Sequence, residues 1–263
     1  MQDGLRFDFA SSSFQYPRDI IHAFIGGSEL HGAKIEGTDD HDIYGVFIEP
    51  PENILGLDAQ EHYVWSTAGT ERRNGPQDID VVLYGLQKWA KLACKGNPSV
   101  LHFLFAPNLA GDDCRTEAWE RVLENKWLFL ARSHCQQYVG YANAQLRKML
   151  GERSRNVRRP ELVEECSFDT KFAMHTIRLM IECRELLTTG FVTLPCVEKD
   201  MLIAIRKGEV DQDWVIRETS ERIAECERLA ETTTVLPAVI DRAEVSRFIA
   251  NTYREHWTAR AGQ

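Results

Sequence analysis

The sequence predicts an α+β fold in which an α/β module is followed by a helical domain. Before about residue 110, short runs rich in β-branched and aromatic residues alternate with turns that contain glycine and proline, a pattern typical of strands. After about residue 116, long segments repeat their apolar residues at helical spacing. We therefore expect a first domain over residues 1–115 and a helical domain over residues 116–263.

The first domain contains four runs that predict β-strands. They are "IIHAFIGG" (20–27), "DIYGVFIEP" (42–50), "EHYVWST" (61–67) and "DIDVVLY" (78–84). The segment "YGLQKWAKLACKGNP" (84–98) then repeats apolar residues at the spacing of a helix. Gly96 supplies a stop signal for that helix, since glycine readily adopts the left-handed conformation found just past helix ends.

The second domain reads as helices throughout. Residues 127–150 form one long periodic segment, and residues 169–190 form another. Asp169 is a candidate N-terminal cap of the second helix, and Gly190 marks its end. We expect three shorter helices to follow, the last of them over residues 242–257.

The formal net charge of −9 argues against a protein that coats nucleic acids non-specifically. One basic stretch, residues 147–159, runs against this acidic background. Its basic side chains are Arg147, Lys148, Arg153, Arg155, Arg158 and Arg159. One interpretation is a solvated helix end that pairs with the acidic "ELVEE" after it. The other is a surface that binds phosphates.

Hydropathy gives an expectation about the compartment. No apolar stretch approaches the roughly 20 residues that cross a bilayer, so we expect no membrane partner. The start of the sequence lacks both a basic region and an uninterrupted apolar region, which are the two parts of a secretory signal. We therefore expect a cytoplasmic protein.

An acidic pair, Asp40 and Asp42, opens the second predicted strand. Alternate side chains of a strand point to one face, so both carboxylates would face one spot. Like charges this close repel unless a cation lies between them, and Mg²⁺ prefers carboxylate oxygens. An EF-hand calcium loop is excluded because Pro51 stands where its last glutamate would be. The glycine-rich fingerprints of phosphate loops and of dinucleotide-binding folds are also absent.

Two further features accompany the pair. The "GGS" turn at residues 26–28 follows an apolar strand, and its exposed backbone amides would suit a polyphosphate. Asp78 and Asp80 stand at alternate positions at the start of another apolar run, so either could supply a third carboxylate. Alternatively, the aspartates cap turns and Ser28 caps a helix. The spacing alone leaves both interpretations open.

These motifs resemble a known family. Gly-Ser, a short gap and Asp-x-Asp before an apolar strand are typical of DNA-polymerase-β-like nucleotidyltransferases. Within that superfamily, "GGSELHG…TDDHDIYGVFIEP" is similar to the first block of the RNA-ligase-associated predicted nucleotidyltransferase family. "DVVLYGLQKWAKLACKGNPSVLHFLFAP", "GYANAQLRKMLG" and "KFAMHTIRLMIECRELLTTGFVTLP" are similar to its later blocks, so the resemblance covers residues 20–210. It implies a nucleotidyltransferase-like mixed β-sheet with flanking helices, followed by a C-terminal helical domain.

The resemblance also implies roles for single residues. Gly27 and Ser28 match the turn that binds the triphosphate. The residues implied in both metal binding and catalysis are Asp40, Asp42 and Asp80. Asp78 stays a substitute for the third of these, because the match at that strand allows either residue.

A later motif of the family is carried by Lys171, His175 and Arg178, which match its Lys-x-x-x-His-x-x-Arg helix. This spacing puts the three side chains on one helix face, where they would contact the nucleotide phosphates or the acceptor. The alternative for His175 is a buried core histidine. Two positions depart from the family: Asp39 stands where a serine is common, and His102 where an acidic residue is usual.

The implied activity is transfer of a nucleoside monophosphate from a nucleoside triphosphate, ATP among the candidates, to an acceptor hydroxyl. The expected cofactor is Mg²⁺ or Mn²⁺. The family's association with RNA ligases implies RNA as the acceptor, in RNA end processing or repair, with residues 147–159 as a candidate contact. Two alternatives remain open: nucleotidylation of a protein hydroxyl, and a non-catalytic module that senses a nucleotide or RNA.

Overall fold

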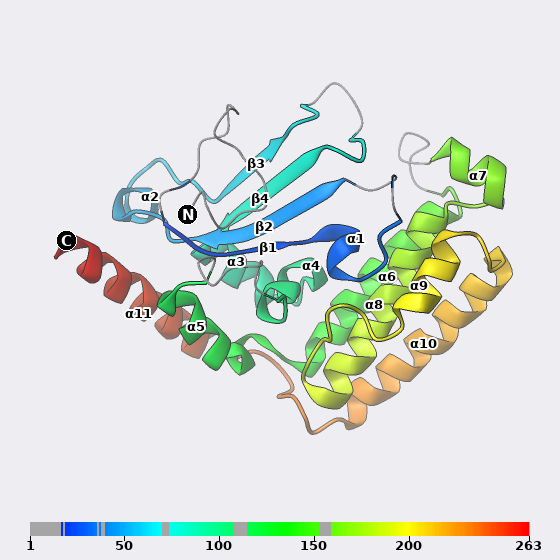
Figure 1. The fold of residues 1–263 in the computed structure, drawn as a ribbon. Helices are drawn as coiled ribbons and strands as arrows, with labels where there is room; N and C mark the ends of the chain where they lie inside the picture. Colours follow the sequence, from blue (N-terminus) through cyan, green and yellow to red (C-terminus); the bar gives the residue numbers. More distant parts are fainter. Residues whose placement is uncertain are drawn as a thin grey trace.

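A computed structural model of the chain describes residue 17 and residues 19–35, 37, 40–69, 74–107, 115–152 and 159–262. A mixed β-sheet lies beside a group of long helices, and other helices cover one face of the sheet (Figure 1). This arrangement confirms the predicted α+β class, with a mixed sheet, flanking helices and a helical C-terminal part. Within the described residues, no helix is long and apolar enough to cross a membrane.

The sheet contains all four predicted strands. They are β1 (Ile20–Ile25), β2 (His41–Phe47), β3 (His62–Ser66) and β4 (Ile79–Gly85), in the order β1-β2-β4-β3. The two central strands, β2 and β4, are parallel, whereas β1 and β3 pair with them antiparallel at the edges. The parallel register brings the beginnings of β2 and β4, where the aspartates lie, to the same end of the sheet.

Helices of the first and last parts of the chain cover one face of this sheet (Figure 1). They are α3 (Leu86–Ala93), α4 (Pro98–Leu101), α5 (Glu117–Glu124) and α11 (Arg242–Ala261). Two short helices, α1 (Gly27–Leu30) and α2 (Pro51–Leu55), follow β1 and β2. The core beneath the sheet is aromatic: the rings of Trp89 and Trp119 meet edge to face with centroids 5.0 Å apart, and both are fully buried.

The long helices pack around α8 (Thr170–Thr189), which carries the Lys-His-Arg face. Its neighbours are α6 (Cys135–Met149), α9 (Lys199–Arg206) and α10 (Gln212–Thr232), with the short α7 (Pro160–Cys166) at one end. The predicted cap is present, since the Asp169 carboxylate accepts from the amides of Lys171 and Phe172. Gly190 ends the helix with a φ of 70°, as glycine readily does.

Two helix predictions differ from the structure. Residues 127–150 do not form one helix but three pieces, η4 (Lys126–Phe129), η5 (Arg132–His134) and α6. The chain is extended at Leu130 and Ala131, and the next two amides donate to the carbonyls of Pro237 (2.9 Å) and Ala238 (3.2 Å). A distant segment therefore replaces the helical hydrogen bonds at this point. The other difference is length, because α10 and α11 have 21 and 20 residues and are not short.

The largest cluster of buried apolar side chains runs from the sheet into the long helices. It includes Phe24 of β1, Trp89 of α3, Tyr138 of α6 and Met180 of α8. Meanwhile α11, from the end of the chain, packs against α3 of the first part. The division into domains at residues 115 and 116 stays a prediction, but the two parts share a packed interior that fixes how their functional residues face each other.

Candidate active site

The strand register places two of the predicted aspartates side by side. Asp42 of β2 is the direct cross-strand partner of Asp80 of β4, and Asp40 lies two residues before Asp42. The side-chain amide of Asn74 donates to Asp40 Oδ2 (2.9 Å) and to Asp80 Oδ2 (2.5 Å), so one nitrogen lies between both carboxylates. The other oxygen of Asp80 is buried and has no hydrogen-bond partner among the described residues. Three carboxylates from two adjacent strands therefore gather at one end of the sheet.

Asp78 lies in a different environment from Asp80. Its side chain turns into the loop before β4, where Oδ1 accepts from the Thr67 hydroxyl (2.8 Å) and Oδ2 accepts from the Gly75 amide (2.7 Å). The residue is buried, and both oxygens are used in holding this turn. The geometry thus favours Asp80 as the third carboxylate and gives Asp78 the turn-capping role that the sequence had left open.

The "GGS" turn approaches the aspartates closely because it consists of glycine. Gly27 has a φ of 60°, and a β-carbon built there would lie 2.0 Å from Asp42 Oδ2. A β-carbon on Gly26 would lie equally close to the ring of Tyr44, and the Gly26 amide donates to the Asp42 carbonyl. Ser28 lies inside α1 and is not its cap, because the cap position is Gly26. Only glycine lets this turn pack directly on β2.

The turn, the acidic pair and the α8 face line one cavity of about 240 Å³, which we name the β2–α8 cavity. Its polar lining residues are Ser28, His31, Asp40, Asp42, Tyr44, Ser99, His102, Lys171, His175 and Arg178, with Gly27 among the rest. Of the predicted catalytic and nucleotide-binding residues, Asp80 does not line this cavity but adjoins it through Asp42. Acidic and basic side chains that are far apart in sequence therefore face each other.

Arg178 is fixed in the cavity wall by a buried network. Its Nη1 donates to Glu182 Oε1 (2.9 Å) and to His31 Nε2 (2.8 Å). On the other side, His102 Nε2 donates to Glu182 Oε2 (3.0 Å). Glu182 is 1% exposed and Arg178 is 7% exposed, so water screens this ion pair little. The network thus holds Nη1 of the guanidinium through two buried partners.

The electrostatic surroundings shift several ionisable groups of this network. Burial, reinforced by Arg178, lowers the pKa of His31 well below its usual range, so His31 is neutral and can accept from the guanidinium. Burial, with Arg178 and Lys171 nearby, also lowers the pKa of His175. For Glu182, burial alone would raise the pKa, but Arg178 and His102 outweigh it and lower the pKa. The lysine and the arginine that line the cavity are Lys171 and Arg178, both from α8.

Two groups of side chains contain the atoms that ligate metal ions. One ligand atom each from His31, His102 and Glu182 lies within 4.8 Å of the others, which would suit a metal. Arg178 Nη1, however, already lies among these atoms and supplies their positive charge. The aspartates fit a hard cation better, since Asp80 Oδ1 is buried without a hydrogen-bond partner in the part of the chain that the structure describes, and since carboxylates are the oxygen ligands that Mg²⁺ prefers.

The basic stretch lies partly outside the described residues, as Arg153, Arg155 and Arg158 do. The remaining members flank the start of α8. Lys148 and Arg159 lie over the ring of Phe172, 5.5 Å and 5.3 Å from its centroid. Arg159 also pairs with Asp169 at 3.2 Å, whereas Arg147 bonds the Asn143 carbonyl in the last turn of α6. Lys148 and Arg159 thus lie beside Phe172, the residue that follows Lys171 on α8.

Sequence reasoning missed several residues of the site. Asn74 lies in a loop and carries no motif signal. His31 lies inside the quoted glycine turn motif, and Glu182 follows Arg178 by four residues on α8, a spacing at which side chains of a helix meet. Testing each cation of the helix for an acid four residues away would have found Glu182. His102 was noted only as a departure from the family, yet it lines the cavity.

Comparisons with known proteins show what this chain is similar to. The model of the RNA repair pathway DNA polymerase beta family (RlaP) matches residues 1–247. An uncharacterized 38.9 kDa protein in the nrdC-mobD intergenic region of Enterobacteria phage T4 is 30% identical over 132 residues. These are 50% of this chain but only 38% of the phage protein, so the match spans well under half of that relative. A nucleotidyltransferase-like protein from Exiguobacterium sibiricum 255-15 is 12% identical, with 81% of this chain and 69% of that one covered. The TM-score of this structural match is 0.29, which is below the level that indicates a shared fold.

Proposed function

This chain belongs to the RNA repair pathway DNA polymerase beta family, and from that premise we propose that it moves a nucleoside monophosphate from a nucleoside triphosphate to a hydroxyl of RNA. Membership makes the protein a nucleotidyltransferase. The choice of RNA as acceptor, the metal ion and the residue roles are the proposal. The phage relative carries no assigned activity, so the acceptor is argued from this chain and its family.

The observation that carries the proposal is the composition of the β2–α8 cavity. Carboxylates from the sheet form one wall, and the cations Lys171 and Arg178 from α8 form the other. The Gly27–Ser28 turn lies between them. A triphosphate needs cations for its oxygens, and an attacking hydroxyl needs a carboxylate to take its proton. The two cations and the carboxylates Asp40 and Asp42 line one cavity of about 240 Å³, and Asp80 adjoins it through Asp42.

Each group has a defined part in the reaction. Lys171 and Arg178 would bind the phosphate oxygens, and Gly27 would let the phosphates lie against the backbone of the turn. The acceptor hydroxyl would give its proton to Asp80, and its oxygen would form a bond to the α-phosphorus. The bond from that phosphorus to the oxygen bridging to the β-phosphorus then breaks, and pyrophosphate leaves with the electron pair.

Enzymes of this superfamily generally depend on divalent metal ions. In this chain Asp40, Asp42 and Asp80 would hold Mg²⁺ or Mn²⁺, which when bound neutralises phosphate charge and polarises the α-phosphate. The amide of Asn74 lies between Asp40 and Asp80 in the structure. It would keep the two carboxylates together in the absence of a cation, since it supplies the positive end of a dipole between them.

Support for RNA comes from the basic side chains beside α8. Lys148 and Arg159 lie over Phe172, next to Lys171 of the cavity wall. A strand that crosses these cations would lead its end toward the β2–α8 cavity. Arg159 is less suitable for a test because it also pairs with the Asp169 cap. Arg147 and Lys148, both in the last turn of α6, are the better positions.

The test combines the purified chain, Mg²⁺ or Mn²⁺, each α-labelled nucleoside triphosphate, and a pool of RNA and protein. We expect label to enter RNA, and an Asp40→Ala/Asp42→Ala variant to lose this transfer. Asp58→Ala, which removes an exposed carboxylate outside the cavity, is the matched control and should keep full activity. Arg147→Ala/Lys148→Ala should weaken RNA binding and reduce its salt dependence together.

Other outcomes would change the proposal in defined ways. Label that enters protein instead of RNA would show a protein hydroxyl as the acceptor. Triphosphate binding without any transfer would indicate a sensing module. RNA binding that is unchanged in the Arg147/Lys148 variant would remove the basic stretch from the account.

A further inference from the structure

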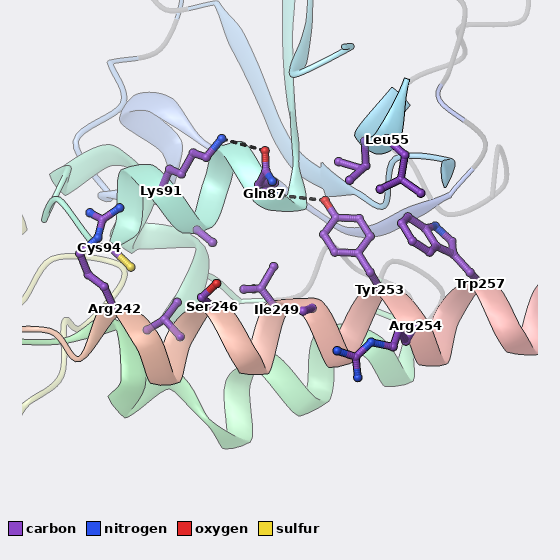
Figure 2. A pocket seen from close by; sticks show the side chains of 14 residues that line it. Leu55, Gln87, Lys91, Cys94, Arg242, Ser246, Ile249, Tyr253, Arg254 and Trp257 are labelled. Carbon is purple, nitrogen blue, oxygen red and sulfur yellow. Dashed lines mark hydrogen bonds between the residues drawn. The ribbon is translucent and has the colours of Figure 1, made fainter. Parts of the chain in front are cut away.

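A second and larger cavity, of about 370 Å³, lies at the other end of β2 from the aspartates. It is a half-open groove between α11 on one side and α3 and α2 on the other (Figure 2). Since β2 has seven residues, about 20 Å of strand separates this groove from the β2–α8 cavity. We name it the α3–α11 groove. No part of the proposed nucleotidyl transfer uses it.

The floor and one lip of the α3–α11 groove are apolar. Val245 and Ile249 of α11 and Ala90 of α3 form the buried floor, while Leu55 of α2, 80% exposed, forms the lip. A leucine this exposed beside a cavity loses contact with water when an apolar ligand covers it.

Two aromatic residues of α11, Tyr253 and Trp257, also line the groove, and their polar atoms form hydrogen bonds within the protein. The Tyr253 hydroxyl donates to the buried Glu49 carboxylate and accepts from the Gln87 amide (3.0 Å; Figure 2). Trp257 Nε1 donates to the Glu49 carbonyl (3.0 Å). With these groups satisfied, the two residues offer the groove mainly their ring carbons. A ligand therefore meets an apolar wall with no buried donor or acceptor that it must satisfy.

The charged residues that line the groove are all cations: Lys91, Arg242 and Arg254. Lys91 bonds the side chain of Gln87 (2.7 Å) and Arg254 bonds that of Asn251 (2.8 Å), which are neutral partners. None of the three forms an ion pair within the described part of the chain. Three unpaired cations around an apolar floor stand out in a chain whose net charge is −9. They create a local positive potential that an anionic group would neutralise.

We propose that the α3–α11 groove binds an amphipathic anion, a molecule with one apolar body and a carboxylate or phosphate head. The body lies on Val245 and Ile249, and the head lies between Lys91 and Arg242. A volume of about 370 Å³ is at the small end of ligand pockets, which fits a single acyl chain or ring system. A free acid and a lipid headgroup share this chemistry. An RNA strand fits less well, because the floor of Val245, Ile249 and Ala90 is aliphatic, whereas bases stack on aromatic rings.

The experiment measures binding of sodium decanoate to the full chain by isothermal titration calorimetry. Decyltrimethylammonium, which has the same chain but a positive head, and acetate, which has the same head but no chain, are the ligand controls. We expect decanoate to bind one per chain and both controls to fail. Lys91→Glu/Arg242→Glu should weaken decanoate binding by about tenfold or more, since two attractive charges become repulsive.

Two further variants separate the groove from general effects. Ser246→Trp places a large ring in the groove from an exposed position of α11, so it should abolish decanoate binding while the circular dichroism spectrum stays unchanged. Arg247→Glu reverses an exposed charge on the same helix outside the groove and should leave the affinity unchanged. Nucleotidyl transfer should persist in all three variants, so a failure here is distinguishable from a failure of the proposed function.

The remaining arms identify the source of the ligand or overturn the proposal. Phosphatidylglycerol vesicles that bind, and lose binding in Lys91→Glu/Arg242→Glu, would supply the same chemistry from a lipid, whereas decanoate binding alone would indicate a free amphiphile. The proposal fails if neither decanoate nor the vesicles bind, or if decyltrimethylammonium binds as tightly as decanoate. It also fails if the Lys91→Glu/Arg242→Glu and Ser246→Trp variants bind decanoate with the affinity of the wild type. It also fails if a short RNA oligonucleotide displaces decanoate, which would make the groove a nucleic-acid surface.

Discussion

Replacing Glu182 by glutamine removes the negative charge that faces Arg178 while it keeps the shape of the side chain. Glu182 is 1% exposed and Arg178 is 7% exposed, so solvent cannot compensate for the lost partner. Breaking one side of a buried ion pair costs about 3–5 kcal/mol of unfolding free energy. Glutamine keeps one oxygen acceptor for Arg178, so we expect the low end, about 3 kcal/mol.

The pH dependence of this loss gives the prediction its sharpest form. Burial would raise the pKa of Glu182, but Arg178 and His102 lower it below its ordinary 4.5. A carboxyl whose pKa is lowered on folding stabilises the protein above its unfolded pKa, and this contribution is lost as the pH falls through the folded value. The difference between wild type and Glu182→Gln should therefore be full at neutral pH and should shrink only below pH 4.5.

Urea unfolding followed by far-UV circular dichroism, at neutral and acidic pH, measures both quantities. Glu221→Gln, at an exposed position of α10, removes a carboxylate of the same type without a buried partner and serves as the control. A loss below about 1 kcal/mol, the usual contribution of a surface ion pair, would contradict this prediction. An equally large loss of unfolding free energy in Glu221→Gln would also contradict it, as would a loss in Glu182→Gln that does not change with pH. We also expect a raised KM for the nucleoside triphosphate in Glu182→Gln, because Arg178 loses the partner that positions it.

Three further predictions follow from the site. Gly27→Ala should lower nucleotidyl transfer about 100-fold, because its methyl group would overlap the aspartate of β2; Gly37→Ala, also at positive φ but in open space, should keep transfer in the same assay. Asp80→Asn should lower the rate of nucleotidyl transfer about 100-fold or more, as loss of a general base does. Asp78→Asn should lower the free energy of unfolding in urea by about 1–2 kcal/mol and leave that rate nearly unchanged. Equal rates in the two variants would contradict the separate roles of Asp78 and Asp80. Folding lowers the pKa of His31, so below pH 6.5 the unfolded chain binds more protons than the folded one. The free energy of unfolding should therefore decrease by about 1.4 kcal/mol for each pH unit by which the pH is lowered below 6.5. In urea unfolding, the free energy of unfolding of His31→Gln should depend less on pH below 6.5. An unchanged pH dependence would contradict a lowered pKa of His31.

Local pattern was enough for the parts of the fold that depend on near neighbours. The alternation of strand side chains indicated that Asp40 and Asp42 face one spot, and the structure has both in one cavity wall. The cap and the stop of α8 were also readable, because Asp169 and Gly190 act on backbone groups a few residues away. The choice between Asp78 and Asp80 was not readable, since it depends on which strand pairs with β2 and in what register.

The parts that could not be predicted depend on contacts between distant segments. The break at Leu130 and Ala131 has no proline or glycine to announce it, because its backbone bonds go to carbonyls more than 100 residues further along the chain. Asn74 joins Asp40 and Asp80 from a loop. Glu182 looked like one polar residue in an apolar helix until Arg178 and the two histidines were seen around it.

The two walls of the β2–α8 cavity explain why the proposed site needs the long helices as well as the sheet. Carboxylates alone would repel a triphosphate, and cations alone would bind it without a group to accept the proton of the attacking hydroxyl. The proposed transfer therefore requires that α8 be held at a fixed distance from the sheet. The loop after β1 makes that connection: Arg178 bonds His31, the Cys196 amide donates to the His31 carbonyl (3.2 Å), and Arg206 donates to the Ala33 carbonyl (2.8 Å). His31 joins both walls, so a change there should alter catalysis and stability together.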